Sequence, residues 1–210
     1  MPAAVYMVPN PNLKFEKGLW PTYPLIAGMD EAGRGALAGP VCVGTVILPN
    51  DNPHLSSTLS GVRDSKLLTP PRRDALVPRI KAAALTWSVA FASVEEIDAL
   101  GIVPATRLAA MRASELLTHF PDYLLTDFRL EVPELDIPQT AIVKGDQKSF
   151  SIAAASILAK TSRDEVMREL ESQYPNYGLG KHKGYGTQVH RQTLKRMGFS
   201  SIHRKTFKVK

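Results

Sequence analysis

Four acidic residues of this 210-residue chain stand where short apolar runs end, and they are Asp30, Glu31, Asp127 and Asp146. If the runs are strands of an α/β sheet, carboxylates at their ends can converge where ligands usually bind. Hard oxygen ligands of this kind hold Mg²⁺ or Mn²⁺. Two such ions about 4 Å apart could activate a water and stabilise the leaving oxygen of a phosphodiester. The pattern therefore predicts a two-ion site for phosphodiester hydrolysis.

The alternative is a purely structural role, in which each carboxylate only caps a turn or a helix. Asp30 and Glu31 argue against it, because two adjacent like charges in an apolar, glycine-rich stretch are costly unless a cation neutralises them. The sequence has no plausible Cys/His or Ser/His/Asp nucleophile arrangement, which fits attack by water. His182 and His190 are eight residues apart without other soft ligands nearby, which argues against zinc.

A glycine turn follows the acidic pair, with Gly33 and Gly35 on either side of Arg34. Glycines permit a tight turn and let a ligand approach the backbone. The exposed N–H groups can bind a phosphate or a sugar hydroxyl, and Arg34 can clamp an anion. Many hairpins contain Gly-x-Gly without binding anything. The position beside Asp30 is what predicts that metal and substrate sites abut.

Further substrate contacts are predicted at Ser65, Lys66, Lys144 and Tyr185. Lysines near a metal cluster commonly meet phosphate, although ordinary surface charge is the alternative. Tyr185 lies between two glycines and beside lysines, where an aromatic ring can stack on a sugar or a base. A buried tyrosine is the alternative, and the flanking glycines favour exposure.

The predicted strands and helices that must position these residues alternate along the chain, which indicates an α/β domain with a mixed sheet. The first two strands are separated only by the turn and should form an antiparallel hairpin. Residues 1–23 are expected to be a loosely ordered arm, and residues 24–210 one domain. Strands are predicted at 25–29, 40–48, 86–92, 123–126 and 140–143, and helices at 70–84, 93–100, 106–120, 151–170 and 187–197.

Composition is that of an ordinary globular protein, with 44% hydrophobic and 22% charged residues. No apolar run approaches the roughly 18 residues of a membrane span, and we expect no secretory signal and no membrane partner. The single cysteine, Cys42, fits a reducing, cytoplasmic setting and a buried apolar position. The net charge is +6, and basic residues crowd the last thirty positions. This tail suits a polyanionic partner or is merely a solvated basic surface.

Several runs together resemble the type 2 ribonuclease H family, ribonuclease HII, over about residues 24–207. They are MDEAGRG at 29–35, AGP at 38–40, DSKL at 64–67, KGD at 144–146, SIAAASILAK at 151–160 with RD at 163–164, YP at 174–175, KGYGT at 183–187 and HR at 203–204. The resemblance implies an RNase H-like fold, a mixed central sheet flanked by helices, with a small basic helical segment at the C-terminus. It implies hydrolysis of RNA in RNA/DNA hybrids and incision 5′ of single ribonucleotides in duplex DNA, leaving 3′-hydroxyl and 5′-phosphate ends. We expect a monomer.

The resemblance also assigns roles to residues. It makes Asp30, Glu31, Asp127 and Asp146 the catalytic metal ligands, residues 33–35 the reader of the 2′-hydroxyl, and Tyr185 the ring that packs on the following deoxyribose. One departure is Asp127-Phe128, where the family usually has Asp-Gly. Two rivals stay open: another RNase H-like nuclease, such as a Holliday-junction resolvase, which would not need the 2′-hydroxyl, and a non-catalytic hybrid-binding module.

Overall fold

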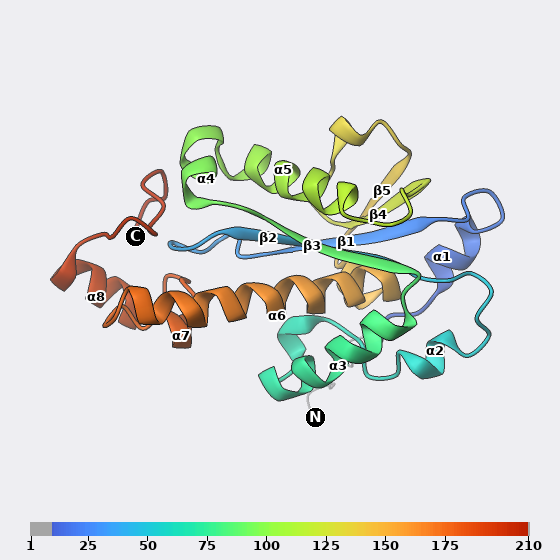
Figure 1. Ribbon diagram of the computed structural model, residues 1–210, viewed down its shortest axis with the longest axis horizontal. Coiled ribbons are helices and arrows are strands. Elements are labelled where there is room, and N and C mark those ends of the chain that lie inside the picture. Colours follow the sequence, from blue (N-terminus) through green and yellow to red (C-terminus); the bar gives the residue numbers. More distant parts are fainter. Residues whose placement is uncertain (1–9, 210) are drawn as a thin grey trace, which may run out of the picture.

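A mixed five-stranded sheet forms the centre of the computed structural model, which describes residues 10–209 (Figure 1). The strand order is β3-β2-β1-β4-β5. β1 pairs antiparallel with β2 and parallel with β4, so the predicted hairpin and mixed sheet are confirmed. The strands are β1 (Ile26–Ala32), β2 (Val41–Ile47), β3 (Thr86–Ala92), β4 (Tyr123–Asp127) and β5 (Gln139–Ile142).

Helices cover both faces of this sheet (Figure 1). α6 (Phe150–Gln173) runs along one face with α3 (Pro70–Ala83) outside it, and α5 (Ile102–Glu115) covers the other. α6 lies very close to the sheet because β1 and β2 have glycines under it. A methyl group on Gly28 would overlap the backbone of Ser151.

The remaining helices are short and lie at the periphery. α4 precedes α5 and carries the predicted capping box, in which Ser93 and Glu96 exchange hydrogen bonds. A single turn, α2, interrupts the expected loop at 50–61, and α5 begins four residues earlier than predicted. α7 was not predicted. Their bounds are α1 (Lys14–Leu19), α2 (Leu55–Thr58), α4 (Val94–Leu100), α7 (Leu179–His182) and α8 (Gln188–Met197).

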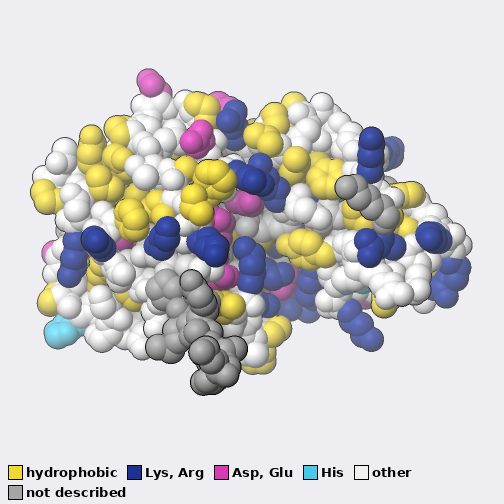
Figure 2. All heavy atoms as spheres, turned by 180° about the vertical axis from the view of Figure 1, so that it is seen from behind, with side chains coloured by type: hydrophobic (Ala, Val, Ile, Leu, Met, Phe, Trp, Pro, Cys, Tyr) yellow, Lys and Arg dark blue, Asp and Glu magenta, His cyan; other side chains and the backbone are white. Residues whose placement is uncertain are grey.

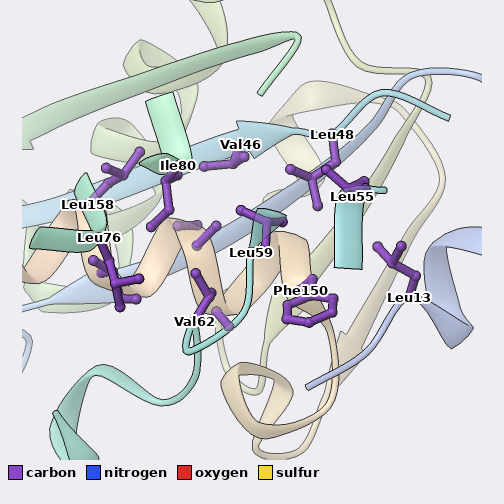
Figure 3. Close-up of a cluster of buried hydrophobic side chains, with 14 of the residues drawn as sticks. Leu13, Val46, Leu48, Leu55, Leu59, Val62, Leu76, Ile80, Phe150 and Leu158 are labelled. Carbon is purple, nitrogen blue, oxygen red and sulfur yellow. The ribbon is translucent and has the colours of Figure 1, made fainter. Parts of the chain in front are cut away.

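One large apolar cluster lies between the sheet, α6 and α3 (Figure 3). Leu55, Leu59 and Ile80 are completely buried there, and Leu76 and Leu158 pack beside them. Each such side chain stabilises the fold by roughly 1.5–3 kcal/mol. This cluster fixes α6 against the sheet, and α6 in turn contributes residues to the site described below. None of the helices within residues 10–209 has both the length and the apolar character that crossing a membrane requires.

The N-terminal segment differs from the predicted loose arm. Residues 14–19 form α1, and Glu16 on this helix is only 1% exposed. Its Oε1 accepts hydrogen bonds from Ser149 Oγ (2.6 Å), Ser151 N (3.0 Å) and Ser151 Oγ (2.7 Å). Because these residues begin α6, Glu16 caps that helix and places negative charge at its positive end. Residues 1–9 of the predicted arm lie outside the described residues.

Candidate active site

The sheet brings the predicted acidic residues together at one edge. Asp30 and Glu31 lie inside β1, not after it, because pairing with β2 continues to Ala32. The parallel register sets Met29 opposite Thr126, so Asp30 and Asp127 come next on neighbouring strands. Asp146 lies in a short 3-10 turn, Gly145–Gln147, between β5 and α6.

Burial and mutual repulsion mark these carboxylates as an electrostatic cluster. The pKa of Asp30 is raised well above its usual value, first by burial and then by Glu31, Asp127 and Asp146. Burial also raises the pKa of Glu31, against the opposing effect of Arg34. The pKa of Asp146 rises to about 7 through burial and the charges of nearby carboxylates. A cation that binds among these carboxylates offsets their repulsion and therefore stabilises the site.

The donor atoms fit a hard divalent cation. All are carboxylate oxygens, and Glu31 Oε2 is buried without a hydrogen-bond partner. Asp127 Oδ1 accepts a hydrogen bond from Gly145 N at 2.6 Å, which fixes this carboxylate against the turn that holds Asp146. As placed within residues 10–209, however, no three His, Cys, Asp or Glu side chains form a group that could hold a metal ion. The carboxylates lie near one another, but three of them do not converge on a single metal position.

A fifth acidic residue, Asp64, belongs to this cluster and was not predicted as a site residue. It is 5% exposed and accepts hydrogen bonds from Lys66 N (2.9 Å) and Gln147 Nε2 (3.0 Å). It also contributes to the raised pKa of Asp146. Asp64 thus joins the 64–67 loop to the turn that carries Asp146. The DSKL motif at 64–67 contains this aspartate, but the sequence predicts substrate contacts only at its serine and lysine.

The three polar residues predicted with the cluster have different settings. Lys66 Nζ lies 4.0 Å from Asp146 Oδ2, and partial burial, which would lower its pKa, is outweighed by the nearby aspartates, so the pKa rises. Ser65 is buried and shares a 2.9 Å hydrogen bond with Ser156 on α6. Lys144 is exposed and has left-handed backbone geometry, and among the described residues it forms no ion pair with the carboxylates. Only Lys66 therefore presents its charge to the cluster.

The glycine turn lies directly beside the cluster. Gly33 has φ +91°, in the left-handed region that favours glycine. Arg34 Nη1 lies 3.7 Å from Glu31 Oε1 and donates to Arg129 O at 3.0 Å. A side chain on Gly35 would meet no atom within 4 Å. Among the hydrogen bonds of residues 10–209, none has the N–H of Arg34 or Gly35 as its donor. Both amides are therefore available to a ligand.

Tyr185 lies on the same side of the cluster. It lines a cavity of about 270 Å³ together with Glu31, Lys66 and Lys160. Its ring is partly exposed, and Lys160 Nζ and the Arg163 guanidinium each lie 5.4 Å from the ring centre. The structure thus places an aromatic face, a carboxylate and two cations around one small opening.

Two buried arginines hold the segment that links the turn to Tyr185. Both lie in runs that carry the family resemblance, but neither was predicted as a site residue. Both are 0% exposed. Arg163 donates to the carbonyls of Pro40 (2.8 Å), Lys183 (2.9 Å) and Ala38 (3.0 Å). Arg204 donates twice to Gly39 O, at 2.8 and 3.0 Å, and once to Arg34 O at 3.0 Å. These contacts satisfy carbonyls of the turn segment. They also join it to α6 and to the C-terminal residues.

Comparison with known proteins agrees over nearly the whole chain. A family profile described as Ribonuclease HII matches residues 27–210. A ribonuclease HII of Dehalococcoides mccartyi is 50% identical over 209 residues, covering 99% of this chain and 95% of that protein. One from Desulfitobacterium hafniense is 52% identical over 196 residues, covering 93% and 73%. The crystal structure of ribonuclease H2 from Pyrococcus horikoshii superposes with a TM-score of 0.73 at 27% identity, covering 88% and 94% of the two chains. The expected RNase H-like fold is confirmed.

Proposed function

The chain belongs to the ribonuclease HII family and is a type 2 ribonuclease H, an endoribonuclease acting on RNA/DNA hybrids, and from this premise we propose a more specific activity. It incises duplex DNA on the 5′ side of a single embedded ribonucleotide, as in ribonucleotide removal during replication and repair. The products carry 3′-hydroxyl and 5′-phosphate ends. The observation that carries this proposal is that the acidic cluster directly adjoins a turn with two available amides.

The acidic cluster suits metal-assisted hydrolysis. Asp30, Glu31, Asp127 and Asp146 would hold Mg²⁺ or Mn²⁺, which, when bound, lowers the pKa of a water and neutralises charge on the leaving oxygen. Glu31 Oε2 supports this assignment because it is a buried acceptor with no partner in the protein. The two hydrogen bonds to Asp64 keep the loop of Lys66 close to Asp146, where the ammonium can meet a phosphate oxygen.

The glycine turn and Tyr185 suit recognition of the sugar. A 2′-hydroxyl can both donate and accept hydrogen bonds, and it distinguishes RNA from DNA. The N–H groups of Arg34 and Gly35 can donate hydrogen bonds to this hydroxyl. At Gly35 no side chain stands between the backbone and the ligand. Tyr185 can pack on the next deoxyribose, because its ring borders the same opening as Glu31. Ser65 and Lys144 have weaker support: one is buried and the other forms no ion pair with the cluster among the described residues.

The charge pattern of the surface suits a duplex. Figure 2 shows Asp and Glu side chains near the middle of one face, with Lys and Arg side chains on both sides of them. Cations on either side of a hydrolytic centre can bind the phosphates that flank the cut and fix the register of the duplex. The net charge of +6 adds long-range attraction for the substrate.

Cleavage of a duplex with one ribonucleotide, in Mg²⁺ or Mn²⁺, tests the proposal, with mapping of both product ends. We expect a single cut 5′ of the ribonucleotide, no cut in an all-DNA duplex of the same sequence, and no cut by Asp30→Asn. No cleavage at high enzyme concentration would overturn the proposal. Equal cleavage of the all-DNA duplex would favour a resolvase, and wild-type behaviour of Asp30→Asn would show that the acidic cluster is not catalytic.

A further inference from the structure

Three histidines, two of them buried, form a cluster next to Tyr185, and the proposed chemistry does not use them. His182 stacks on His190 with ring centres 4.1 Å apart, and His190 Nε2 lies 3.1 Å from His203 Nε2. His190 and His203 are both 0% exposed. Tyr177 and Phe199 pack around His203, and Arg204 is its chain neighbour.

The hydrogen bonds of His190 and His203 run in one direction. Ser200 N–H donates to His203 Nδ1 at 3.0 Å, so this nitrogen carries no proton and His203 Nε2 carries it. His203 Nε2–H must then donate to His190 Nε2, which leaves the proton of His190 on Nδ1. His190 Nδ1–H donates to the carbonyl of Tyr185 at 3.0 Å. The chain therefore leads from the C-terminal segment to the backbone of Tyr185.

This order of donors requires both rings to be neutral. Burial lowers the pKa of His190, with a smaller contribution from His182. Burial and the neighbouring His190 lower the pKa of His203 to about 4. Both rings are therefore uncharged near neutral pH, and the donor order stays fixed there.

A structural metal does not explain the cluster. The ring nitrogens of His182 are also engaged, with Nε2 2.8 Å from Tyr177 O and Nδ1 accepting from Gly184 N at 3.2 Å. Every ring nitrogen of the three histidines therefore already has a partner within the described residues. Within the described residues the three histidines also do not form a group of three or more side chains placed to hold a metal ion.

Backbone pairing extends the same connection to the glycine turn. Leu37 N donates to Gly184 O (2.8 Å), and Arg204 N donates to Leu37 O (2.9 Å). The segment at 36–39 thus lies between the residues around Tyr185 and the residues around His203. A displacement of His203 or His190 would shift Tyr185 relative to the turn at 33–35.

We propose that His190 and His203 are positioning residues for ribonucleotide recognition, because their directed hydrogen bonds fix the backbone of Tyr185 against the glycine turn. The inference rests on the proposed function, in which Tyr185 contacts the sugar that follows the ribonucleotide. The two histidines touch no reacting atom. They act through Tyr185, and their effect should vanish when the Tyr185 ring is removed.

A double-mutant cycle on binding tests this. The readout is the ratio of Kd for an all-DNA duplex to Kd for the same duplex with one ribonucleotide, measured in EDTA so that no cleavage is needed. His190→Leu removes the donor to Tyr185 O, and we expect the ratio to fall about fivefold, as for one buried hydrogen bond. His190→Asn keeps a donor near Nδ1 and should restore most of the ratio. In a Tyr185→Ala background, His190→Leu should cause no further loss.

Leu194→Ala is the matched control, because Leu194 is buried in the same C-terminal cluster and its apolar side chain takes no part in the hydrogen-bond chain. It should lower the melting temperature and leave the binding ratio unchanged. If His190→Leu does not melt cooperatively, His190→Gln replaces it, since a glutamine amide reaches the position of Nε2 but not that of Nδ1.

The outcomes separate the two proposals. Additive losses for His190→Leu and Tyr185→Ala, or an equal loss for Leu194→Ala, would overturn the positioning role. An unchanged ratio for Tyr185→Ala would overturn it as well, together with the sugar contact assigned to Tyr185. A wild-type protein that keeps the binding ratio and its coupling but does not cleave would overturn only the proposed catalytic activity.

Discussion

Arg163 lies directly beneath Gly33, and its Nε, Cδ and Cζ atoms occupy the space that a side chain on residue 33 would need. The guanidinium is held there by three backbone carbonyls, so it cannot easily move away. Glycine at 33 is therefore required by the fold. Gly35 differs, because a Cβ there would have no atom within 4 Å and the φ of this residue is not left-handed. Glycine at 35 has no such packing reason, and the proposed access for substrate is the reason that remains to be tested.

The pair Gly33→Ala and Gly35→Ala separates these two reasons. Gly33→Ala should lower the free energy of unfolding by about 1–3 kcal/mol or more, because of its φ of +91° and the overlap with Arg163. Gly35→Ala should change stability by less than about 0.5 kcal/mol but reduce cleavage of a duplex with one ribonucleotide. Urea unfolding and initial cleavage rates measure the two effects. Full activity of Gly35→Ala would refute substrate access at this position.

Asp30→Asn should increase the stability of the metal-free protein and reduce its cleavage activity. Removing one charge from a buried group of carboxylates relieves repulsion, so we expect the metal-free protein to gain about 1 kcal/mol or more. Loss of a metal ligand should reduce cleavage by at least about 100-fold. Melting curves in EDTA check the first effect. Asp51→Asn, an exposed position with the same charge change, is the control and should leave both properties unchanged.

The pH dependence of stability should reveal Asp146. Its pKa is about 7 in the folded protein and near 3.8 when unfolded, so the folded state binds more protons between these values. Stability without metal should therefore fall as pH rises from about 4 to 7, by an amount on the order of 1–3 kcal/mol for this group. Asp146→Asn should flatten that part of the curve in urea titrations. A curve with the same slope in both proteins would contradict the assigned pKa.

Divalent cations should reverse this loss. In the proposed site, Mg²⁺ or Mn²⁺ would bind only the folded cluster, so adding it at pH 7.5 should raise the melting temperature of the wild type. The same addition should have a smaller effect on Asp146→Asn. An equal rise in both proteins would show that the ion binds elsewhere.

Local patterns in the sequence predict most of the sheet, because most strands are apolar or alternating runs bounded by glycine, proline or polar residues. The end of β1 was misplaced, since Asp30 and Glu31 look like residues that follow a strand. Their backbone nevertheless continues to pair with β2, opposite Gly44 and Val43. Here tertiary pairing overrides local polarity.

The site residues were predictable where a motif marked them and not where a distant contact creates their role. Asp64 reaches Gln147 across 83 positions of sequence, and Arg204 reaches Gly39 across 165. No periodicity or local spacing encodes such contacts. α1 was missed for a related reason: it has only six residues, and its one buried side chain is a glutamate whose partners lie at the start of α6.

Glu16 therefore offers a test of whether the N-terminal helix is an integral part of the fold. Glu16→Ala leaves three buried donors on Ser149 and Ser151 without their acceptor and removes a charge from the N-terminus of α6. We expect a loss of about 2–4 kcal/mol in the free energy of unfolding. Glu16→Gln keeps a carbonyl acceptor and should lose less. Lys17→Ala, exposed on the same helix, should be neutral. Cleavage well below the melting temperature should persist in all three variants, because Glu16 touches none of the acidic site residues. Wild-type stability of Glu16→Ala in urea would mean that α1 does not anchor α6.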